Sequence, residues 1–459
     1  YIHGETKSGF NGASNITKEK KLTIKFDKSD FVRMKDRCLF DEYNLIKKLG
    51  EGAYGSVYKI QQKTTNYLRA VKALKRKNVD EEVFINEIQL LKTLDHPNII
   101  KLFDCYYDNR YYYMVEEYCS GGDLFDYIQK EKFFTEKKAS KIFNQLLSVV
   151  NHLHKKNIVH RDLKPENIVF IETNDKNIFI KLIDFGTSIS IKDKNLTQEL
   201  GTIYYIAPEV FMNDYNEKAD IWSCGIILYT MLCGHPPFCG NKEDVIKKKI
   251  LECKLNCPLK EFKNISKDAI DYIKLLLSYN PDDRPTAEEA LNNKWLVETV
   301  NENKSKLSDY VIKNLTKFRT TLGLQKATVS FLANQISINE EIRQLKDEFD
   351  KIDVNKDGEI SEEELIRCLE VLYPHEEAKQ KAKDIFKEID FNNDGTINFS
   401  EFLTVNISKE KLLSVETLKK AFKLFDIDGN GYITKDELKE TMPLEITSKS
   451  GWVELVSEV

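Results

Sequence analysis

The strongest constraint on this chain is a twelve-residue pattern that occurs three times near its C-terminal end. Each copy has Asp at its first position, Asp or Asn at its third and fifth, Gly at its sixth and Glu at its twelfth. The copies begin at Asp353, Asp390 and Asp426, so the intervals between them are 37 and 36 residues. Repeats at this spacing indicate an array of similar structural units.

The residue types in each copy suit a hard divalent cation. Oxygen ligands from positions 1, 3 and 5, a backbone carbonyl from position 7 and a bidentate Glu from position 12 form the calcium loop of an EF-hand, where Gly at position 6 makes the sharp turn. One such window can be an acidic loop by chance, whereas three in register predict EF-hands. The predicted calcium ligands are Asp353, Asn355, Asp357, Glu359 and Glu364, then Asp390, Asn392, Asp394, Thr396 and Glu401, then Asp426, Asp428, Asn430, Tyr432 and Glu437.

EF-hands work in pairs, and three loops leave one loop without a partner. Val456 and Val459 take the places of the apolar residues that precede the other loops. We therefore expect a fourth loop directly after Val459 in the full-length protein. A gene sequence without an acidic loop at that point would contradict this expectation.

The charge of the chain is distributed unevenly. Residues 336–459 contain 29 acidic and 17 basic residues, which gives −12, whereas the preceding part carries +7. An acidic end suits cation binding and lacks the basic stripe of a nucleic-acid interface. No apolar run reaches the roughly 18 residues that span a bilayer. The nine cysteines lack the paired spacing of a zinc site, and we expect them to be reduced, as in an intracellular protein.

Hydrophobic patterns divide the rest of the chain, which at 459 residues is long enough for two or three domains. Residues 1–40 are polar and are predicted to be an irregular extension. Short β-type runs begin at Tyr43 and predict an antiparallel sheet, and apolar spacings of 3 and 4 predict helices from about residue 136. The predicted fold class is α+β, with a strand-rich lobe, a helical lobe and a final all-α domain.

An amphipathic connector follows the helical lobe. Its apolar residues have helical spacing, and its polar face carries several Lys and Arg residues, which are most often simply solvated. The pattern predicts a helix whose apolar face consists of Leu307, Val311, Leu315, Phe318 and Leu322.

A glycine-rich segment lies between the first two predicted strands. Glycines let the backbone approach phosphate oxygens without a clash from Cβ, although hairpin glycines often serve only a turn. No helix is predicted after the segment, which disfavours a dinucleotide-binding fold. The predicted nucleotide contacts are Gly50, Glu51, Gly52, Ala53, Tyr54, Gly55, Ser56 and Val57.

Further motifs follow this segment in a fixed order. They are Ala70-Val71-Lys72, then Glu87 in a helical pattern, then HRDLKPEN over residues 160–167, then Asp184-Phe185-Gly186, and finally Ala207-Pro208-Glu209. Together these motifs resemble the eukaryotic protein kinase family over roughly residues 40–296, and their joint occurrence is highly specific.

The resemblance implies roles for the residues around the nucleotide. Lys72, with Glu87 as its ion-pair partner, would contact the α- and β-phosphates of ATP. Ala70 and the hinge residues Glu117 and Cys119 would contact the base.

The resemblance also implies the residues of phosphoryl transfer, which depends on positioning and charge neutralisation. Asn167 and Asp184 would hold Mg²⁺. Asp162 would orient the attacking hydroxyl and accept its proton, and Lys164 would contact the γ-phosphate, as in the serine/threonine class. Because every such position carries the expected side chain, an inactive kinase-like scaffold is disfavoured.

Two positions depart from the family pattern. Glu116 stands behind the adenine pocket, where apolar residues or Thr are usual, and a buried carboxylate there is costly unless it is paired or reaches water. Gln198 stands at the usual phosphorylation position of the activation segment, next to Glu199. Activation by phosphorylation of this segment is therefore disfavoured relative to another switch.

The kinase motifs, the connector and the EF-hands occur in the order found in the calcium-dependent protein kinases of plants and protists, which the chain resembles beyond residue 40. The resemblance implies a bilobal kinase domain at 41–296, an autoinhibitory junction at 297–344 and a calmodulin-like domain at 345–459. It implies a calcium-activated serine/threonine kinase that uses ATP, Mg²⁺ and Ca²⁺ and is inhibited by the junction until calcium binds.

Two other interpretations stay open, namely a kinase whose EF-hands only dock it on partners, and a calcium-dependent scaffold without activity. Asp123 and Glu166 favour protein substrates with a basic residue before the target Ser or Thr. We expect a cytoplasmic monomer with no nucleic-acid partner. Membrane attachment is expected only if a segment before Tyr1 carries a lipid.

Overall fold

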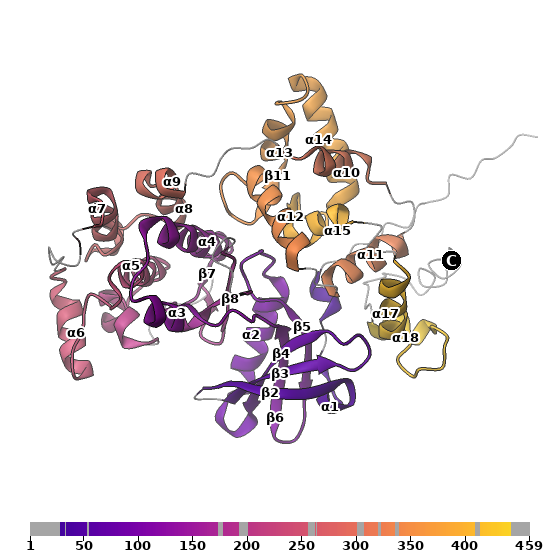
Figure 1. The fold of residues 1–459 in the computed structure, drawn as a ribbon, viewed down its shortest axis with the longest axis horizontal. Helices are drawn as coiled ribbons and strands as arrows, with labels where there is room; N and C mark the ends of the chain where they lie inside the picture. Colours follow the sequence, from indigo (N-terminus) through magenta and orange to yellow (C-terminus); the bar gives the residue numbers. More distant parts are fainter. Residues whose placement is uncertain are drawn as a thin grey trace, which may run out of the picture.

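A computed structural model describes most of the chain beyond the N-terminal segment. The described residues are 28–32, 34–52, 55–172, 178–191, 201–255, 262, 264–300, 307–319, 323–335, 339–408 and 414–441. Figure 1 shows a strand-rich lobe, a helical lobe and a second helical domain, in the order expected for the α+β class. None of the described helices is long and apolar enough to cross a membrane.

The small lobe is a six-stranded sheet in the order β1-β5-β6-β4-β3-β2, with helix α2 (Glu81–Thr93) packed against it. All neighbouring strands are antiparallel except β1 and β5. The strands are β1 (Met34–Lys35), β2 (Tyr43–Glu51), β3 (Gly55–Gln62), β4 (Leu68–Lys75), β5 (Leu102–Tyr107) and β6 (Tyr111–Glu117), with the 3₁₀ turn η2 (Arg76–Asn78) after β4.

The prediction of an irregular extension over residues 1–40 was wrong for its last part. This part forms the 3₁₀ turn η1 (Lys28–Phe31), strand β1 and the start of helix α1 (Leu39–Glu42). Strand β1 is fixed by Lys35, whose Nζ lies 2.7 Å from Asp104 Oδ1 and 3.2 Å from Glu42 Oε2. Asp104 is remote in the sequence, so no local pattern could reveal this strand.

The large lobe is built around helix α5 (Lys218–Cys233), which is buried along almost its whole length. Helix α4 (Glu136–Lys155) packs beside it. The other helices are α3 (Leu124–Glu131), α6 (Glu243–Glu252), α7 (Lys267–Leu276), α8 (Ala287–Leu291) and α9 (Lys294–Val300). The short strands are β7 (Ile158–Val159), β8 (Ile168–Phe170), β9 (Ile180–Leu182) and β10 (Ile189–Ser190), and the 3₁₀ turns are η3 (Pro165–Asn167), η4 (Ile203–Tyr205), η5 (Pro208–Met212) and η6 (Pro281–Asp283).

The second helical domain contains the three repeats and both connector helices. The connector forms α10 (Asp309–Lys317) and α11 (Gly323–Gln335). The repeats form α12 (Asn339–Ile352), β11 (Glu359–Ser361), α13 (Glu362–Leu369), α14 (His375–Ile389), β12 (Thr396–Asn398), α15 (Phe399–Asn406), α17 (Val415–Phe425) and α18 (Lys435–Thr441). The predicted domain edges at 296 and 344 fall inside α9 and α12, so the backbone does not break there.

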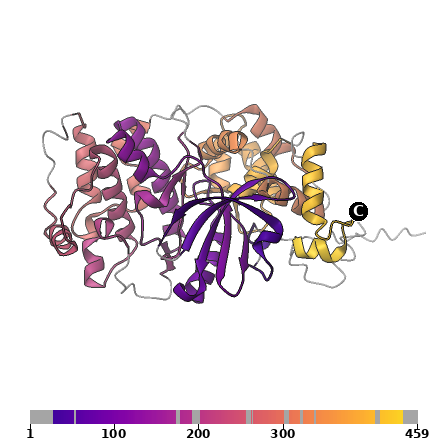
Figure 2. The same cartoon turned by 60° about the horizontal axis from the view of Figure 1, so that its bottom comes forward.

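Apolar side chains of the connector lie in a core that is separate from the core of the two lobes. Val311, Leu315 and Phe331 are buried there together with residues of α12, α13, α14, α15 and α17. The periodicity predicted helix over the whole run from Leu307, but α10 ends at Lys317 because Phe318 is extended and packs into this core. Figure 2 shows the sheet between the large lobe on one side and these helices on the other.

Candidate active site and calcium sites

Three charged side chains that are distant in the sequence meet between the lobes. Lys72 Nζ lies 2.8 Å from both Glu87 Oε1 and Asp184 Oδ1. Burial alone would lower the pKa of Lys72, but the two carboxylates outweigh it and hold this pKa above its usual range. Burial alone would raise the pKa of Asp184, yet Lys72 holds it below its usual range. The site therefore keeps Lys72 and Asp184 charged, as phosphate and metal binding require.

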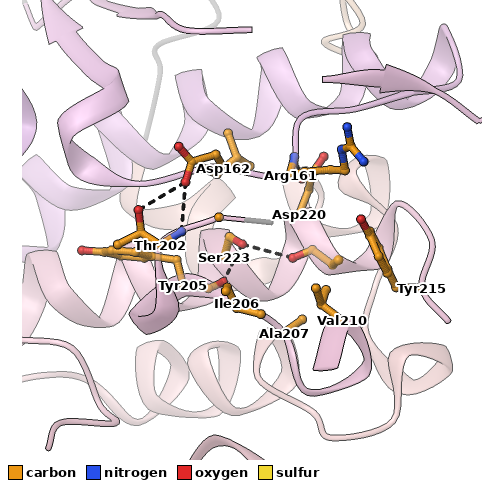
Figure 3. Close-up of a pocket in the computed structure, with 13 residues that line it drawn as sticks. Arg161, Asp162, Thr202, Tyr205, Ile206, Ala207, Val210, Tyr215, Asp220 and Ser223 are labelled. Carbon is orange, nitrogen blue, oxygen red and sulfur yellow. Dashed lines mark hydrogen bonds between the residues drawn. The ribbon is translucent and has the colours of Figure 1, made fainter. Parts of the chain in front are cut away.

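The predicted catalytic residues of the large lobe share one hydrogen-bond network. Lys164 Nζ donates to Asp162 Oδ2 over 2.6 Å and to Thr202 Oγ1 over 3.1 Å. The Thr202 amide donates to Asp162 Oδ1 over 3.1 Å, as Figure 3 shows. Asn167 Nδ2 donates to the Asp162 carbonyl over 2.8 Å, so the Asn167 Oδ1 atom is available to a metal ion. The network fixes the orientation of the Asp162 carboxylate.

Buried Asp220 holds the backbone of this loop in place. Its carboxylate accepts hydrogen bonds from the amides of His160 and Arg161 over 2.9 and 3.0 Å. Arg161 has φ of 70°, a conformation that non-glycine residues rarely adopt, so it needs such support. Burial would raise the pKa of Asp220, but the hydrogen bond from His154 and nearby charge lower it.

The predicted phosphate-binding segment forms the turn from β2 to β3. Its two sides are in register, Gly50 with Val57 and Glu51 with Ser56. The Gly52 amide donates to the Gly55 carbonyl over 2.9 Å. A Cβ at Gly55 would lie 2.0 Å from the Ala73 carbonyl oxygen, so only glycine fits there. Two other predicted contacts, Ala53 and Tyr54, lie outside the described residues.

The predicted base-binding residues lie on β4, on β6 and in the segment after β6. Ala70 stands opposite Glu116 in the sheet, so both side chains point to the same face as Lys72. The Glu117 amide is bonded to the Lys101 carbonyl over 2.9 Å. The Cys119 amide donates no hydrogen bond to any residue that the structure describes, and it is therefore available to a base.

Glu116, the unusual residue behind this pocket, is a weakened acid. Burial is the main cause that raises its pKa to about 8, the nearby carboxylates of Glu87 and Asp184 act in the same direction, and Lys72 opposes them. No hydrogen bond or ion pair joins its carboxyl group to another residue in the described part of the chain. Its neutral form therefore avoids the cost of an unpaired buried charge.

The charged and amide side chains between the lobes suit the binding of a nucleotide with its magnesium ion. Lys72 supplies a cation for phosphate, and Asn167 and Asp184 supply the oxygen atoms that Mg²⁺ prefers. When bound, ATP supplies the phosphoryl group and Mg²⁺ neutralises part of its charge.

The three repeats all form loops with the same internal hydrogen bonds. In each loop the carboxylate of the twelfth residue accepts from the amide of the second, over distances of 3.0, 2.8 and 2.8 Å. The first Asp accepts from the amide of the Gly at position 6, over 2.9, 3.1 and 2.9 Å. This arrangement brings together the predicted ligand residues at positions 1, 3, 5 and 12, which are Asp353, Asn355, Asp357 and Glu364; Asp390, Asn392, Asp394 and Glu401; and Asp426, Asp428, Asn430 and Glu437.

The predicted ligands at position 7 would bind calcium through their backbone carbonyls, so their side chains are free to make other contacts. Glu359 pairs with Lys156, Thr396 donates to Asp394, and Tyr432 is exposed. Strands β11 and β12 pair with each other and so join the first two loops. In the third loop, carboxylate oxygen atoms of Asp426, Asp428 and Glu437 lie within 4.8 Å of one another, close enough to share one cation.

Burial and mutual repulsion disfavour the charged carboxylates of the first two loops when no cation is present. Burial, and then the charge of Asp357, raises the pKa of Asp353 well above its usual range. Burial also raises the pKa of Glu401 well above its usual range. A divalent cation in each of these two loops would offset this repulsion.

The large-lobe residues that contact the first calcium loop were not predicted from the sequence. Helix α4 presents Ser148, Asn151, His152 and Lys155 to this loop, and Lys156 follows the helix. These residues form an interface rather than a local motif, so a pattern search along the chain does not find them.

Comparisons with known families agree with the two kinds of site. Residues 43–296 match the protein kinase domain family. Residues 342–405 match an EF-hand domain pair, and residues 417–444 match a single EF-hand domain.

Curated relatives extend the match over most of the chain. Calcium-dependent protein kinase 4 of Plasmodium falciparum is 38% identical over 448 residues, which cover 94% of this chain and 85% of the relative. Calcium-dependent protein kinase 5 of Plasmodium berghei is 37% identical over 428 residues, which cover 91% and 75%. The order of domains, the assembled kinase site and these identities show that the chain belongs to the calcium-dependent protein kinase family, whose members are calcium-activated serine/threonine protein kinases.

Proposed function

We propose that the junction at 297–344 inhibits this kinase by covering the protein-substrate face of the large lobe, and that calcium binding to the EF-hands removes it. The observation that supports this proposal is the position of the connector. Its residues Val311, Leu315 and Phe331 are buried against EF-hand helices. This arrangement corresponds to the released state of the proposed switch.

The proposed switch depends on competition between the EF-hand domain and the large lobe for the apolar face of the connector. The connector cannot bury these side chains in the EF-hand domain and on the large lobe at the same time. Calcium shifts the balance to the extent that it binds the released state more tightly than the inhibited state.

In the released state the kinase residues are positioned for phosphoryl transfer. Asp162 accepts the proton of the substrate hydroxyl at its carboxylate, whose orientation Thr202 and Lys164 fix. Lys72, held by Glu87, and Lys164 place positive charge where negative charge develops on the transferred group.

We propose protein substrates with a basic residue before the target Ser or Thr. Glu166 is exposed, and its charge acts on Tyr205, which lines the small pocket drawn in Figure 3. Asp123 caps helix α3 by accepting from the Asp126 amide over 2.8 Å, which fixes its carboxylate near the surface. Two acids near the catalytic loop favour a positively charged peptide.

The experiment that tests the switch is phosphorylation of a basic serine peptide by the whole chain with MgATP, in calcium and in chelator. Activity that appears only with calcium supports the junction as inhibitor. Equal activity in both conditions would leave the kinase intact and refute the inhibition, in favour of EF-hands that only dock the enzyme on partners. An acidic peptide of equal length is the control for substrate charge.

We also propose that the protein is a cytoplasmic monomer, with membrane attachment only through an N-terminal lipid. Buried thiols such as Cys105 and Cys224 are free, which suits a reducing compartment. Fractionation of cells that express the full-length protein, with detection of soluble and membrane fractions, tests this location.

A further inference from the structure

The first calcium loop differs from the other two in its surroundings. All three loops have Gly at position 6 in the left-handed conformation, with φ between 81° and 90°. A Cβ at Gly358 would lie 2.4 Å from His96 Cδ2 and 3.1 Å from His152 Nδ1 of the kinase domain. A Cβ at Gly395 or Gly431 would meet no atom within 4 Å. The glycine of the first loop is therefore the one of these three that packs against the kinase domain. The second loop meets the kinase domain at its eleventh position, where the Ser400 amide donates to Asp95 Oδ2 over 3.1 Å, and no contact of this second loop with α4 is seen in the described part of the chain.

Side chains of α4 bind backbone carbonyls on the outside of the first loop. Asn151 Nδ2 donates to the Asn355 carbonyl over 3.1 Å, and His152 Nδ1 lies 2.6 Å from the Asp357 carbonyl. Ser148 Oγ donates to the Lys356 carbonyl over 3.2 Å. These carbonyls belong to positions 3, 4 and 5, whereas the backbone ligand of a calcium loop is the carbonyl at position 7.

The hydrogen bond from Ser148 is itself held in place by a buried histidine. His96 Nδ1 accepts from the Asn98 amide over 3.0 Å, which makes Nε2 the protonated nitrogen. His96 Nε2 then donates to Ser148 Oγ over 3.0 Å, so the Ser148 proton is directed to the loop. The direction of the Ser148 hydroxyl is therefore set by residues of the kinase domain rather than by the loop.

Two lysines act on the acidic side chains of the same loop. Lys156 Nζ lies 2.6 Å from Glu359 Oε1, a side chain that position 7 does not use for calcium. Lys155 Nζ lies 2.9 Å from Asp357 Oδ2, a predicted ligand side chain. The contact of Lys155 competes with calcium for Asp357, whereas the contact of Lys156 does not.

We propose that docking on α4 raises the calcium affinity of the first loop alone, because Asn151, Ser148 and His152 hold its backbone in the calcium-binding form. The three contacts to backbone carbonyls favour the folded loop. The contact of Lys155 with Asp357 opposes calcium binding, and we expect this opposition to be the smaller of the two effects. By reciprocity, calcium in this loop strengthens docking by the same factor. The inference rests on the calcium switch proposed above and assigns the coupling to one loop.

The test is calcium titration of the whole chain by calorimetry, in buffer that contains Mg²⁺. We expect Asn151→Ala to weaken one calcium site about tenfold and leave the other sites unchanged. Lys155→Met should leave that site as tight or tighter. Lys137→Ala, on an exposed position of the same helix, is the matched control, and circular dichroism checks that each variant folds.

Silencing single loops identifies the affected site. Glu364→Gln removes the bidentate ligand of the first loop. When Asn151→Ala is added to this variant, the calcium affinity of the remaining sites should not change. Glu401→Gln silences the second loop instead. When Asn151→Ala is added to this variant, the tenfold loss of calcium affinity at one site should persist. The proposal is overturned if Asn151→Ala changes no site, or if its effect persists when the first loop is silenced.

The activity assay separates this inference from the proposed function. A wild-type chain that is activated by calcium, together with an Asn151→Ala variant of unchanged calcium affinity, refutes only the coupling through the first loop. A wild-type chain that is equally active in calcium and chelator refutes the switch itself.

Discussion

Lys72 Nζ and Glu87 Oε1 lie 2.8 Å apart, so strand β4 and helix α2 are joined by an ion pair inside the small lobe. The same ammonium group contacts Asp184, which belongs to the other side of the cleft. In this arrangement the EF-hand domain holds the connector, and the kinase residues are already assembled.

The first prediction concerns this ion pair. Glu87→Gln should lower kcat/KM in calcium by about 100-fold or more, because Lys72 loses the charge that orients it toward phosphate. Peptide phosphorylation at saturating calcium measures the effect. Glu131→Gln removes an exposed partner of Lys138 and should leave the rate unchanged. A Glu87→Gln enzyme of wild-type activity would show that the pair has no catalytic role.

The second prediction concerns the support of the catalytic carboxylate by Thr202. Thr202→Val removes the hydroxyl that accepts from Lys164 over 3.1 Å, whereas Thr202→Ser keeps it. We expect kcat to fall about tenfold or more in the Val variant and to recover in the Ser variant, with little change in nucleotide affinity. Steady-state kinetics and binding of a fluorescent nucleotide measure the two quantities. Equal losses in both variants would point to packing rather than to the hydroxyl.

The third prediction concerns stability. Arg284 is fully buried and donates to Glu209 over 2.5 and 2.8 Å. Glu209→Gln leaves a buried cation without its counter-charge, which should lower the free energy of unfolding of the large lobe by about 3–5 kcal/mol. Urea unfolding followed by tryptophan fluorescence measures this loss. The exposed pair of Lys294 and Asp268 is the comparison, and Asp268→Asn should cost about 1 kcal/mol or less.

The sequence predicted best those residues whose chemistry fixes both their type and their spacing. The calcium loops need oxygen ligands at set positions, and phosphoryl transfer needs Lys72, Asp162, Asn167 and Asp184, so the order of residues along the chain is enough to identify them. The fold class follows because the same motifs require a sheet, a catalytic loop and paired helices around them.

The sequence did not predict contacts between segments that meet only in the folded chain. Strand β1 pairs with β5, where Lys35 also reaches Asp104. The first calcium loop contacts α4 through residues such as Asn151, which meets Asn355 about 200 positions away. The composition of strand β1 does not specify its partner, and neither does the composition of the first calcium loop. The early end of helix α10 has the same origin, since Phe318 turns into a core formed largely by later helices.

The last prediction is a pH dependence that originates in Glu116. The pKa of its carboxyl group is raised from 4.5 to about 8, chiefly by burial, with Glu87 of α2 and Asp184 adding to the shift and Lys72 of β4 opposing it. Between these two values the native state binds a proton that the unfolded state releases. The free energy of unfolding therefore falls as the pH rises from about 4.5 to about 8, and the contribution is flat above that range.

Glu116→Gln should remove this dependence. Because the side chain is partly open to the cleft, the change in stability is smaller than the full pKa shift would give. We expect the urea midpoint of the wild type to decrease from pH 6 to pH 8.5 by more than that of Glu116→Gln, so that the variant gains relative stability at the higher pH. The exposed substitution Glu131→Gln should follow the wild type. Parallel midpoints for the wild type and Glu116→Gln would show that Glu116 is already ionised at pH 6, and that its charge is balanced by Lys72 after all.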